Sequence, residues 1–363
     1  MTEREPMDEL EALAAADAAV EVPAPTPARR GERPGRRRGV VLQPRDLALL
    51  RALGEARYLT AQALEWLFYP NWRERYKTYL EQRKAQPALS FLPSPNVYRR
   101  IGALAGAVPP LVVRLDRLSE QARHATGRIR GVYALTEAGA EQVAEATGAD
   151  LGALWYEDGR RRSAKNLEHS AEIGLFYGAL RAALEHTGHQ LEGWQTDERL
   201  AARGPAGGPN YDRVLVPGIR EPIAVLPDAT FTLEGQRFFV EIDRARTNMT
   251  SWAEKLRAFE AYRGRHQLRD RYGVADFVVL VVSPNETRQR RIAEEVLKVT
   301  RHAGDRYRFL LADRVHPTLI RPAWRVVTSF TWERQRVVDR MVEVPAQLRW
   351  SAVPLWQIPQ QTV

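Results

Sequence analysis

Residues 222–262 read PIAVLPDATFTLEGQRFFVEIDRARTNMTSWAEKLRAFEAY, a stretch that predicts two strands followed by a helix. The first strand is expected over residues 223–233, and a turn at Glu234-Gly235 joins it to a second strand over residues 237–243. Ser251 is expected to cap a helix that continues to about residue 262. The pattern therefore predicts a hairpin and a helix around which the rest of a mixed α/β domain is organised.

Three carboxylates belong to this hairpin. Side chains alternate across a strand, so Glu241 and Asp243 share one face with Phe239. Asp228 is expected in the middle of the neighbouring strand, where its carboxylate can converge with the other two. Burying unpaired carboxylates costs free energy, so the three need partners, and a divalent cation is one suitable partner.

The spacing of these acids resembles the signature of the PD-(D/E)xK nucleases, because Asp228 follows a proline and precedes Glu241 by thirteen residues. Asp243 stands where that signature has lysine, and Lys255 on the following helix is the candidate replacement. The resemblance implies Mg²⁺ or Mn²⁺ as cofactor. Asp228, Glu241 and Lys255 would be catalytic, and Asp228, Glu241, Asp243 and Glu172 would be metal ligands. Glu168 is the alternative to Glu172 as the acid of the first helix. The alternative is an ordinary hairpin whose acids form salt bridges.

Composition favours a polyanionic partner. The 363 residues include 54 Lys and Arg against 45 Asp and Glu, a formal net charge of +9. The chain has no cysteine, which excludes disulfides, thiolate zinc sites and a cysteine nucleophile. It has no signal peptide and no apolar run of membrane-spanning length, so a cytoplasmic protein without a membrane partner is expected.

Residues 1–38 are expected to form a disordered arm. They are rich in Ala, Pro and charged residues and contain few bulky apolar side chains that could build a core. Six arginines lie between residues 29 and 38, where they could follow phosphates or enter a minor groove. The alternative is a solvated tail whose arginines are partly neutralised by the acidic residues before them.

Residues 39–147 predict three helices and then a two-stranded hairpin. The helices are expected from Pro44 to Gly54, over residues 61–68 and over residues 97–104, and the hairpin strands over residues 111–115 and 132–135. This order resembles a winged helix-turn-helix, in which the third helix enters the major groove of DNA. The candidate DNA-binding residues are Tyr98, Arg99 and Arg100 in the third helix and Arg123, Arg128 and Arg130 in the basic hairpin loop. The alternative is a winged helix that binds protein.

The remaining chain is expected to contain a linker over residues 148–165, a nuclease-like domain over residues 166–320 and a tryptophan-rich tail over residues 321–363. The predicted order of the middle part is helix, three strands, helix, strand, helix, strand. The expected fold is therefore α+β or α/β with two domains, an N-terminal winged helix-turn-helix and a C-terminal PD-(D/E)xK-like mixed sheet flanked by helices. The tail is expected to pack on the body or on a second subunit.

Five short motifs resemble the replication-relaxation family of bacterial plasmids and integrative elements. They are YALTEAG at 133–139, LEHSAE at 167–172, LPDATF at 226–231, FFVEIDRA at 238–245 and KLRAFEAY at 255–262. The resemblance spans about residues 44–285 and implies DNA binding in replication, relaxation or mobilisation. The implied partners are double-stranded DNA, a second copy of the chain and other replication or mobilisation proteins. A metal-dependent DNA endonuclease and a transcriptional regulator are the alternatives.

Overall fold

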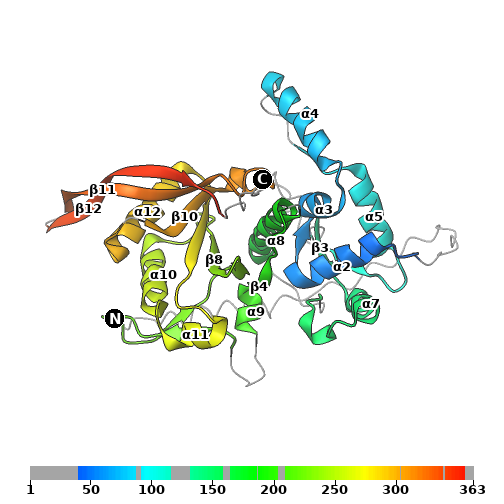
Figure 1. Ribbon diagram of the computed structural model, residues 1–363, viewed down its shortest axis with the longest axis horizontal. Coiled ribbons are helices and arrows are strands. Elements are labelled where there is room, and N and C mark those ends of the chain that lie inside the picture. The colour runs from blue at the N-terminus through cyan, green and yellow to red at the C-terminus, as the bar shows by residue number, and fades with distance from the viewer. Residues whose placement is uncertain are drawn as a thin grey trace, which may run out of the picture. The chain divides into compact units, whose positions relative to one another are not determined.

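The computed structural model describes residues 40–86, 91–115, 131–157, 164–185, 187–202, 209–302, 304–337 and 340–355. The chain forms two compact units, drawn in Figure 1. The first unit comprises Met1–Ala61 and Leu92–Ala171, and the second comprises Gln62–Phe91 and Glu172–Val363. The arm expected over residues 1–38 and the basic hairpin loop lie outside the described residues.

Helices and a small antiparallel sheet make up the first unit. Its elements are α2 (Pro44–Ala56), β1 (Leu59–Thr60), α5 (Pro95–Ala105), β2 (Val112–Arg114), β3 (Val132–Leu135), α7 (Glu137–Thr147) and the 3₁₀ turn η2 (Leu151–Ala153). The sheet has the order β1-β3-β2. Gly139 lets α7 approach this sheet closely, since a Cβ there would lie 2.2 Å from the Leu111 carbonyl oxygen.

Helix α5 shows how local sequence sets an element of this unit. The Ser94 hydroxyl accepts a hydrogen bond from the Asn96 N–H, which caps the helix start. Val97, Ile101 and Leu104 recur at helical spacing and are fully buried. The helix therefore has one apolar face in the core and one polar face directed outward.

The second unit contains α3 from Gln62 onward, α4 and a seven-stranded mixed sheet. Helix α3 (Ala61–Phe68) has the expected bounds, and α4 (Trp72–Ala85) lies between it and α5. The sheet order is β12-β11-β10-β9-β8-β7-β4. Its strands are β4 (Glu192–Thr196), β7 (Ala229–Leu233), β8 (Gln236–Ile242), β9 (Val278–Ser283), β10 (Gly304–Leu311), β11 (Trp324–Val337) and β12 (Arg340–Val353). Strands β8, β9 and β10 are parallel, and the other neighbours are antiparallel.

Helices cover both faces of this sheet (Figure 1). Phe238, Val240 and Ile242 of β8 pack on one face with residues of α8 (Ala164–Leu184). Phe239 on the other face packs with α10 (Met249–Tyr262) and α12 (Glu286–Thr300). The alternation expected along this strand is therefore confirmed. The second unit also contains α9 (Asp197–Ala201), α11 (His266–Tyr272) and the 3₁₀ turn η3 (Ala312–Arg314).

The hairpin that organises the prediction forms, with two corrections. Glu234 and Gly235 both have positive φ, 54° and 72°, as a tight two-residue hairpin turn requires. The strand expected over residues 223–233 is broken, however. Its first part, β6 (Ile223–Val225), pairs with β5 (Asp212–Val214) in a separate sheet, and only β7 pairs with β8. Pro227 cannot donate to a strand ladder, which explains the break.

Three other element boundaries differ from expectation. Asn248, not Ser251, caps α10, because its side chain accepts a hydrogen bond from the Ser251 N–H. Helix α2 continues through Gly54, and α8 begins inside the expected linker. The tail after residue 320 forms β11 and β12, fourteen residues each, which extend the sheet beyond β10. Among the described helices, none combines the length and apolar character needed to cross a membrane.

Candidate functional site

Glu241 and Lys255 form the centre of a polar site in the second unit. Glu241 lies in β8 and is 3% exposed. Lys255 lies on the border of the apolar face of α10, and its Nζ donates a hydrogen bond to Glu241 Oε2 at 2.6 Å. Burial opposes the charge of Lys255, but Glu241 and Asp228 outweigh it and raise the pKa of Lys255 above its usual value. Lys255 is therefore an ammonium donor at neutral pH and not a base.

Asp228 lies directly before β7 rather than within a strand. Its Oδ2 accepts a hydrogen bond from the Ile242 N–H at 2.6 Å, which holds the carboxylate next to the strand that carries Glu241. Its backbone carbonyl accepts a hydrogen bond from the N–H of Asp197, the first residue of α9. Asp197 also acts electrostatically on Lys255. The structure therefore brings Asp228, Glu241 and Lys255 together and adds Asp197.

Sequence reasoning missed Asp197. The available signal was its position directly after the first of the three strands expected in the nuclease-like domain, which the structure shows as β4, at the start of the short helix α9. That signal does not show which neighbouring strand the residue meets. The pairing of Thr196 with Ala229 supplies this information, because it aligns the end of β4 with the start of β7.

Asp243 does not converge with the other acids as a ligand. It shares the α10 face with Glu241, but Arg288 donates to its two oxygens at 2.7 and 2.9 Å. The Trp252 indole N–H and the Ala245 backbone N–H also donate to Asp243, each at 3.1 Å. Hydrogen bonding to Asp243 raises the pKa of Arg288, which keeps this pair ionised. The expectation of three converging carboxylates is therefore wrong for Asp243.

Glu172 has an arginine partner as well. Glu172 lies on α8, and its Oε2 is 3.2 Å from Nε of Arg244, the second residue after β8. Of the other expected metal ligands, Asp228 accepts a hydrogen bond from the Ile242 N–H, and Glu241 pairs with Lys255. Carboxylate oxygens are ligands that Mg²⁺ and Mn²⁺ accept, so these two residues fit such an ion.

The candidate DNA-binding residues of α5 differ in exposure. Arg99 is exposed, and Tyr98 is half-buried. Arg100 Nε donates to Asp46 Oδ1 at 2.7 Å, its Nη2 donates to Asp46 Oδ2, and the same Nη2 donates to the Val41 carbonyl. Asp46 is fully buried, so Arg100 neutralises a core carboxylate, and the expectation that it shares the exposed face with Arg99 is wrong. Arg123, Arg128 and Arg130 lie outside the described residues.

The chain is a two-unit α/β protein with a mixed sheet and a carboxylate–lysine site, and many different proteins share these features. Sequence comparison identifies the family. The model of the replication-relaxation family matches residues 50–278, and the chain belongs to that family. Family membership suggests a role in replication or relaxation.

No curated protein matches the chain in sequence. Among solved structures, protein VC1899 from Vibrio cholerae is similar at 12% identity with a TM-score of 0.24. The alignment covers 78% of this chain and 56% of that chain, so this chain spans little more than half the length of VC1899.

Proposed function

We propose that this protein binds double-stranded DNA through its first unit, as a winged helix-turn-helix, in replication, relaxation or mobilisation of a plasmid or integrative element. The observation that carries the proposal is α5, which buries Val97, Ile101 and Leu104 and presents Arg99 to solvent. The chain order α2, β1, α3, α4, α5 and the hairpin β2–β3 supports it, with β1, β3 and β2 as the sheet and α4 as an additional helix before α5. Helices α2 and α5 and the sheet belong to the first unit, whereas α3 from Gln62 onward and α4 belong to the second.

The charge of the chain agrees with this proposal. A net charge of +9 attracts DNA, and a basic side chain on an exposed helix face can reach a phosphate or a guanine edge. Arg100 contributes indirectly here, because its bonds to Asp46 connect α5 to the start of α2. Arg99 would contact DNA, and Arg100 would keep the helix that presents Arg99 in place.

The test is a fluorescence-anisotropy titration of a labelled duplex at several salt concentrations. Arg99→Ala should weaken binding and, if Arg99 contacts one phosphate, reduce the log–log salt slope by about 0.9. Arg257→Ala is the matched control, because Arg257 is an exposed helical arginine of the second unit. Equal affinity and slope for wild type and Arg99→Ala would contradict α5 as the DNA-binding helix.

A second candidate function is metal-dependent cleavage of DNA by the second unit, as in PD-(D/E)xK nucleases. The contact between Lys255 Nζ and Glu241 Oε2, beside Asp228, favours it. Asp228 and Glu241 would hold Mg²⁺ or Mn²⁺, which would polarise the phosphate and activate water. Lys255, charged at neutral pH, would donate hydrogen bonds to the water or to the developing negative charge.

This second candidate is tested with plasmid nicking beside thermal melts with and without Mn²⁺. Asp228→Asn is the preferred variant, because the Asn carbonyl can still accept from the Ile242 N–H while the negative charge is lost. A Mn²⁺-dependent rise in Tm and nicking, both absent in the variant, would support a nuclease. A rise in Tm without nicking would leave a metal-stabilised DNA-binding protein, and no effect of Mn²⁺ on wild type would exclude the metal site.

A further inference from the structure

A pocket of about 460 Å³ opens in the second unit between the end of α10, α12 and β10. None of Asp197, Asp228, Glu241 and Lys255 lines it, so it is a different site from the carboxylate–lysine cluster. Pockets of this size commonly bind small molecules. Its walls therefore indicate which ligand it suits.

Glu260 provides the acceptor of the polar wall. Its Oε1 accepts hydrogen bonds from Arg263 Nε at 2.8 Å and from the Tyr307 hydroxyl at 2.7 Å. Burial, together with the charge of Glu260, raises the pKa of Tyr307 well above its usual value, so the tyrosine keeps its proton. Both donors use Oε1, and Oε2 of this pocket-lining carboxylate accepts no hydrogen bond from the described residues. The second oxygen is available to a ligand N–H.

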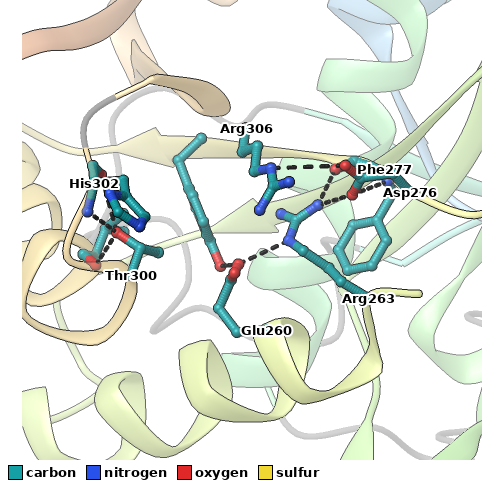
Figure 2. A network of polar contacts seen from close by, with 9 residues as sticks. Glu260, Arg263, Asp276, Phe277, Thr300, His302 and Arg306 are labelled. Carbon is teal, nitrogen blue, oxygen red and sulfur yellow. Dashed lines mark hydrogen bonds and ion pairs between the residues drawn. The ribbon is translucent and has the colours of Figure 1, made fainter. Parts of the chain in front are cut away.

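Arg306 provides a donor on the same side of the pocket. Its side chain is 59% exposed, and its Nε lies 3.6 Å from Asp276 Oδ2. Arg263 Nη1 donates to the other oxygen of Asp276, and Figure 2 shows the resulting series from Glu260 through Arg263 and Asp276 to Arg306. Of the charged residues that line the pocket itself, Glu260 and Asp305 are acidic and Arg306 is basic, and Asp305 Oδ2 lies 3.8 Å from Arg308 Nη2. The wall thus lacks the excess positive charge of a phosphate site.

Apolar side chains form another part of the pocket. Val296 and Leu297 of α12, Phe309 of β10 and Val327 of β11 line it and are at most 5% exposed. A flat apolar ring can therefore be covered while its polar edge meets Glu260 and Arg306. The pocket matches an uncharged ring that has an N–H donor and a carbonyl acceptor side by side.

We propose that this pocket binds a nucleobase, with guanine as the best match. Guanine presents the O6 acceptor next to the N1–H and N2–H donors, so Arg306 would donate to O6 and Glu260 Oε2 would accept from N1–H and from the N2 amino group. Reading the edge of an unstacked base by hydrogen bonds while its ring contacts apolar side chains is an established mode of recognition. The base has two chemical sources, a free guanine nucleoside or an unstacked guanine of a single strand.

The test is isothermal titration calorimetry of the full chain with guanosine, adenosine, cytidine and thymidine. Guanosine should bind saturably, and Glu260→Gln should weaken its binding at least tenfold, because a hydrogen bond to a charged group is lost. Arg306→Ala should have a similar effect, and its exposed side chain makes loss of folding a poor explanation. Glu254→Gln is the matched control on an exposed position of α10 and should bind as wild type does.

The two sources are separated by comparing guanosine with a five-nucleotide oligo-dG. Equal affinities point to a free nucleoside, and a much higher affinity for the oligonucleotide that Glu260→Gln removes points to a base within a strand. No saturable binding of either, equal binding of adenosine and guanosine, or unchanged binding in both variants would overturn the proposal. Since the nucleoside titration needs no duplex, its result is independent of the proposed function of the first unit.

Discussion

His316 is expected to make the second unit sensitive to mild acid. Its imidazole is 6% exposed and stacks on Tyr76, with ring centroids 3.8 Å apart. Trp66 of α3 and Trp72 of α4 meet the same ring edge-on, at 5.2 and 5.5 Å. The Nδ1 atom contacts Thr318, while Nε2 is buried and makes no hydrogen bond among the described residues. On the doubly protonated ring, the Nε2–H would therefore have no acceptor among the described residues.

The magnitude follows from the pKa. Burial lowers the pKa of His316 from 6.5 to about 4. Between these values the unfolded chain binds a proton that the folded chain does not, so stability falls as pH falls through this window. The full difference corresponds to about 3 kcal/mol at about 1.36 kcal/mol per pH unit, and about 2 kcal/mol is reached by about pH 5.

The assay is urea unfolding followed by tryptophan fluorescence at pH 7.5 and about pH 5. Trp155 alone among the nine tryptophans belongs to the first unit, so the signal reports mainly on the second. His316→Phe keeps an aromatic ring but cannot be protonated. Between the two pH values, wild type should lose about 2 kcal/mol more free energy of unfolding than this variant.

His302→Phe is the matched control, because His302 is exposed in the same unit and should leave the pH dependence unchanged. The variant His316→Phe loses the contact with Thr318 and can be less stable at both pH values, so the comparison rests on the difference between them. If wild type and His316→Phe lose the same free energy on acidification, the buried neutral histidine does not control this behaviour and the reasoning is refuted.

Four further predictions follow from the remaining sites. Arg99→Ala should leave Tm unchanged and weaken duplex binding, as salt titrations of anisotropy will measure. Arg100→Met should remove the arginine partner of the fully buried Asp46 and destabilise α2 and α5 by about 2 kcal/mol, less than for a fully buried pair because Arg100 is partly exposed. Hydrogen exchange in both helices should therefore be roughly 30-fold faster. Adding Asp46→Asn should recover much of the lost stability. Mn²⁺ should raise the Tm of wild type but not of Asp228→Asn, as thermal melts will show. Removing residues 1–38 should leave Tm unchanged and lower non-specific DNA affinity; a fall in Tm would mean that this arm packs on the folded chain.

Local patterns predicted much of the fold. The turn at Glu234-Gly235 follows from residues that accept positive φ, and the alternation along β8 follows from the two-residue period of a strand. Lys255 was the candidate replacement for the lysine of the nuclease signature because it lies on the helix that follows β8, and the structure places its Nζ 2.6 Å from Glu241 Oε2. In each case the determining residues are close together in sequence.

Partners that are distant in sequence were not predictable in the same way. Arg288 neutralises Asp243 from forty-five residues away, and Arg100 meets Asp46 across fifty-four. The mixed polar and apolar sequence of β11 and β12 did not predict that this tail extends the sheet. Such strands are stabilised by pairing with a neighbouring strand and not by their own composition. The acids Asp243 and Glu172 were therefore found from sequence, but Arg288 and Arg244, which form ion pairs with them, were not.

The division of the chain bears on how it is made and folded. The path passes from one unit to the other three times, after Ala61, Phe91 and Ala171. Trp66 and Trp72, synthesised early, are 4% and 1% exposed in the core of a unit whose sheet strands all follow residue 190. During synthesis these two side chains lack their packing partners in the sheet until the ribosome has added more than a hundred further residues. A fragment starting at residue 166 would lack both tryptophans, so cutting the chain at one position cannot yield either unit complete.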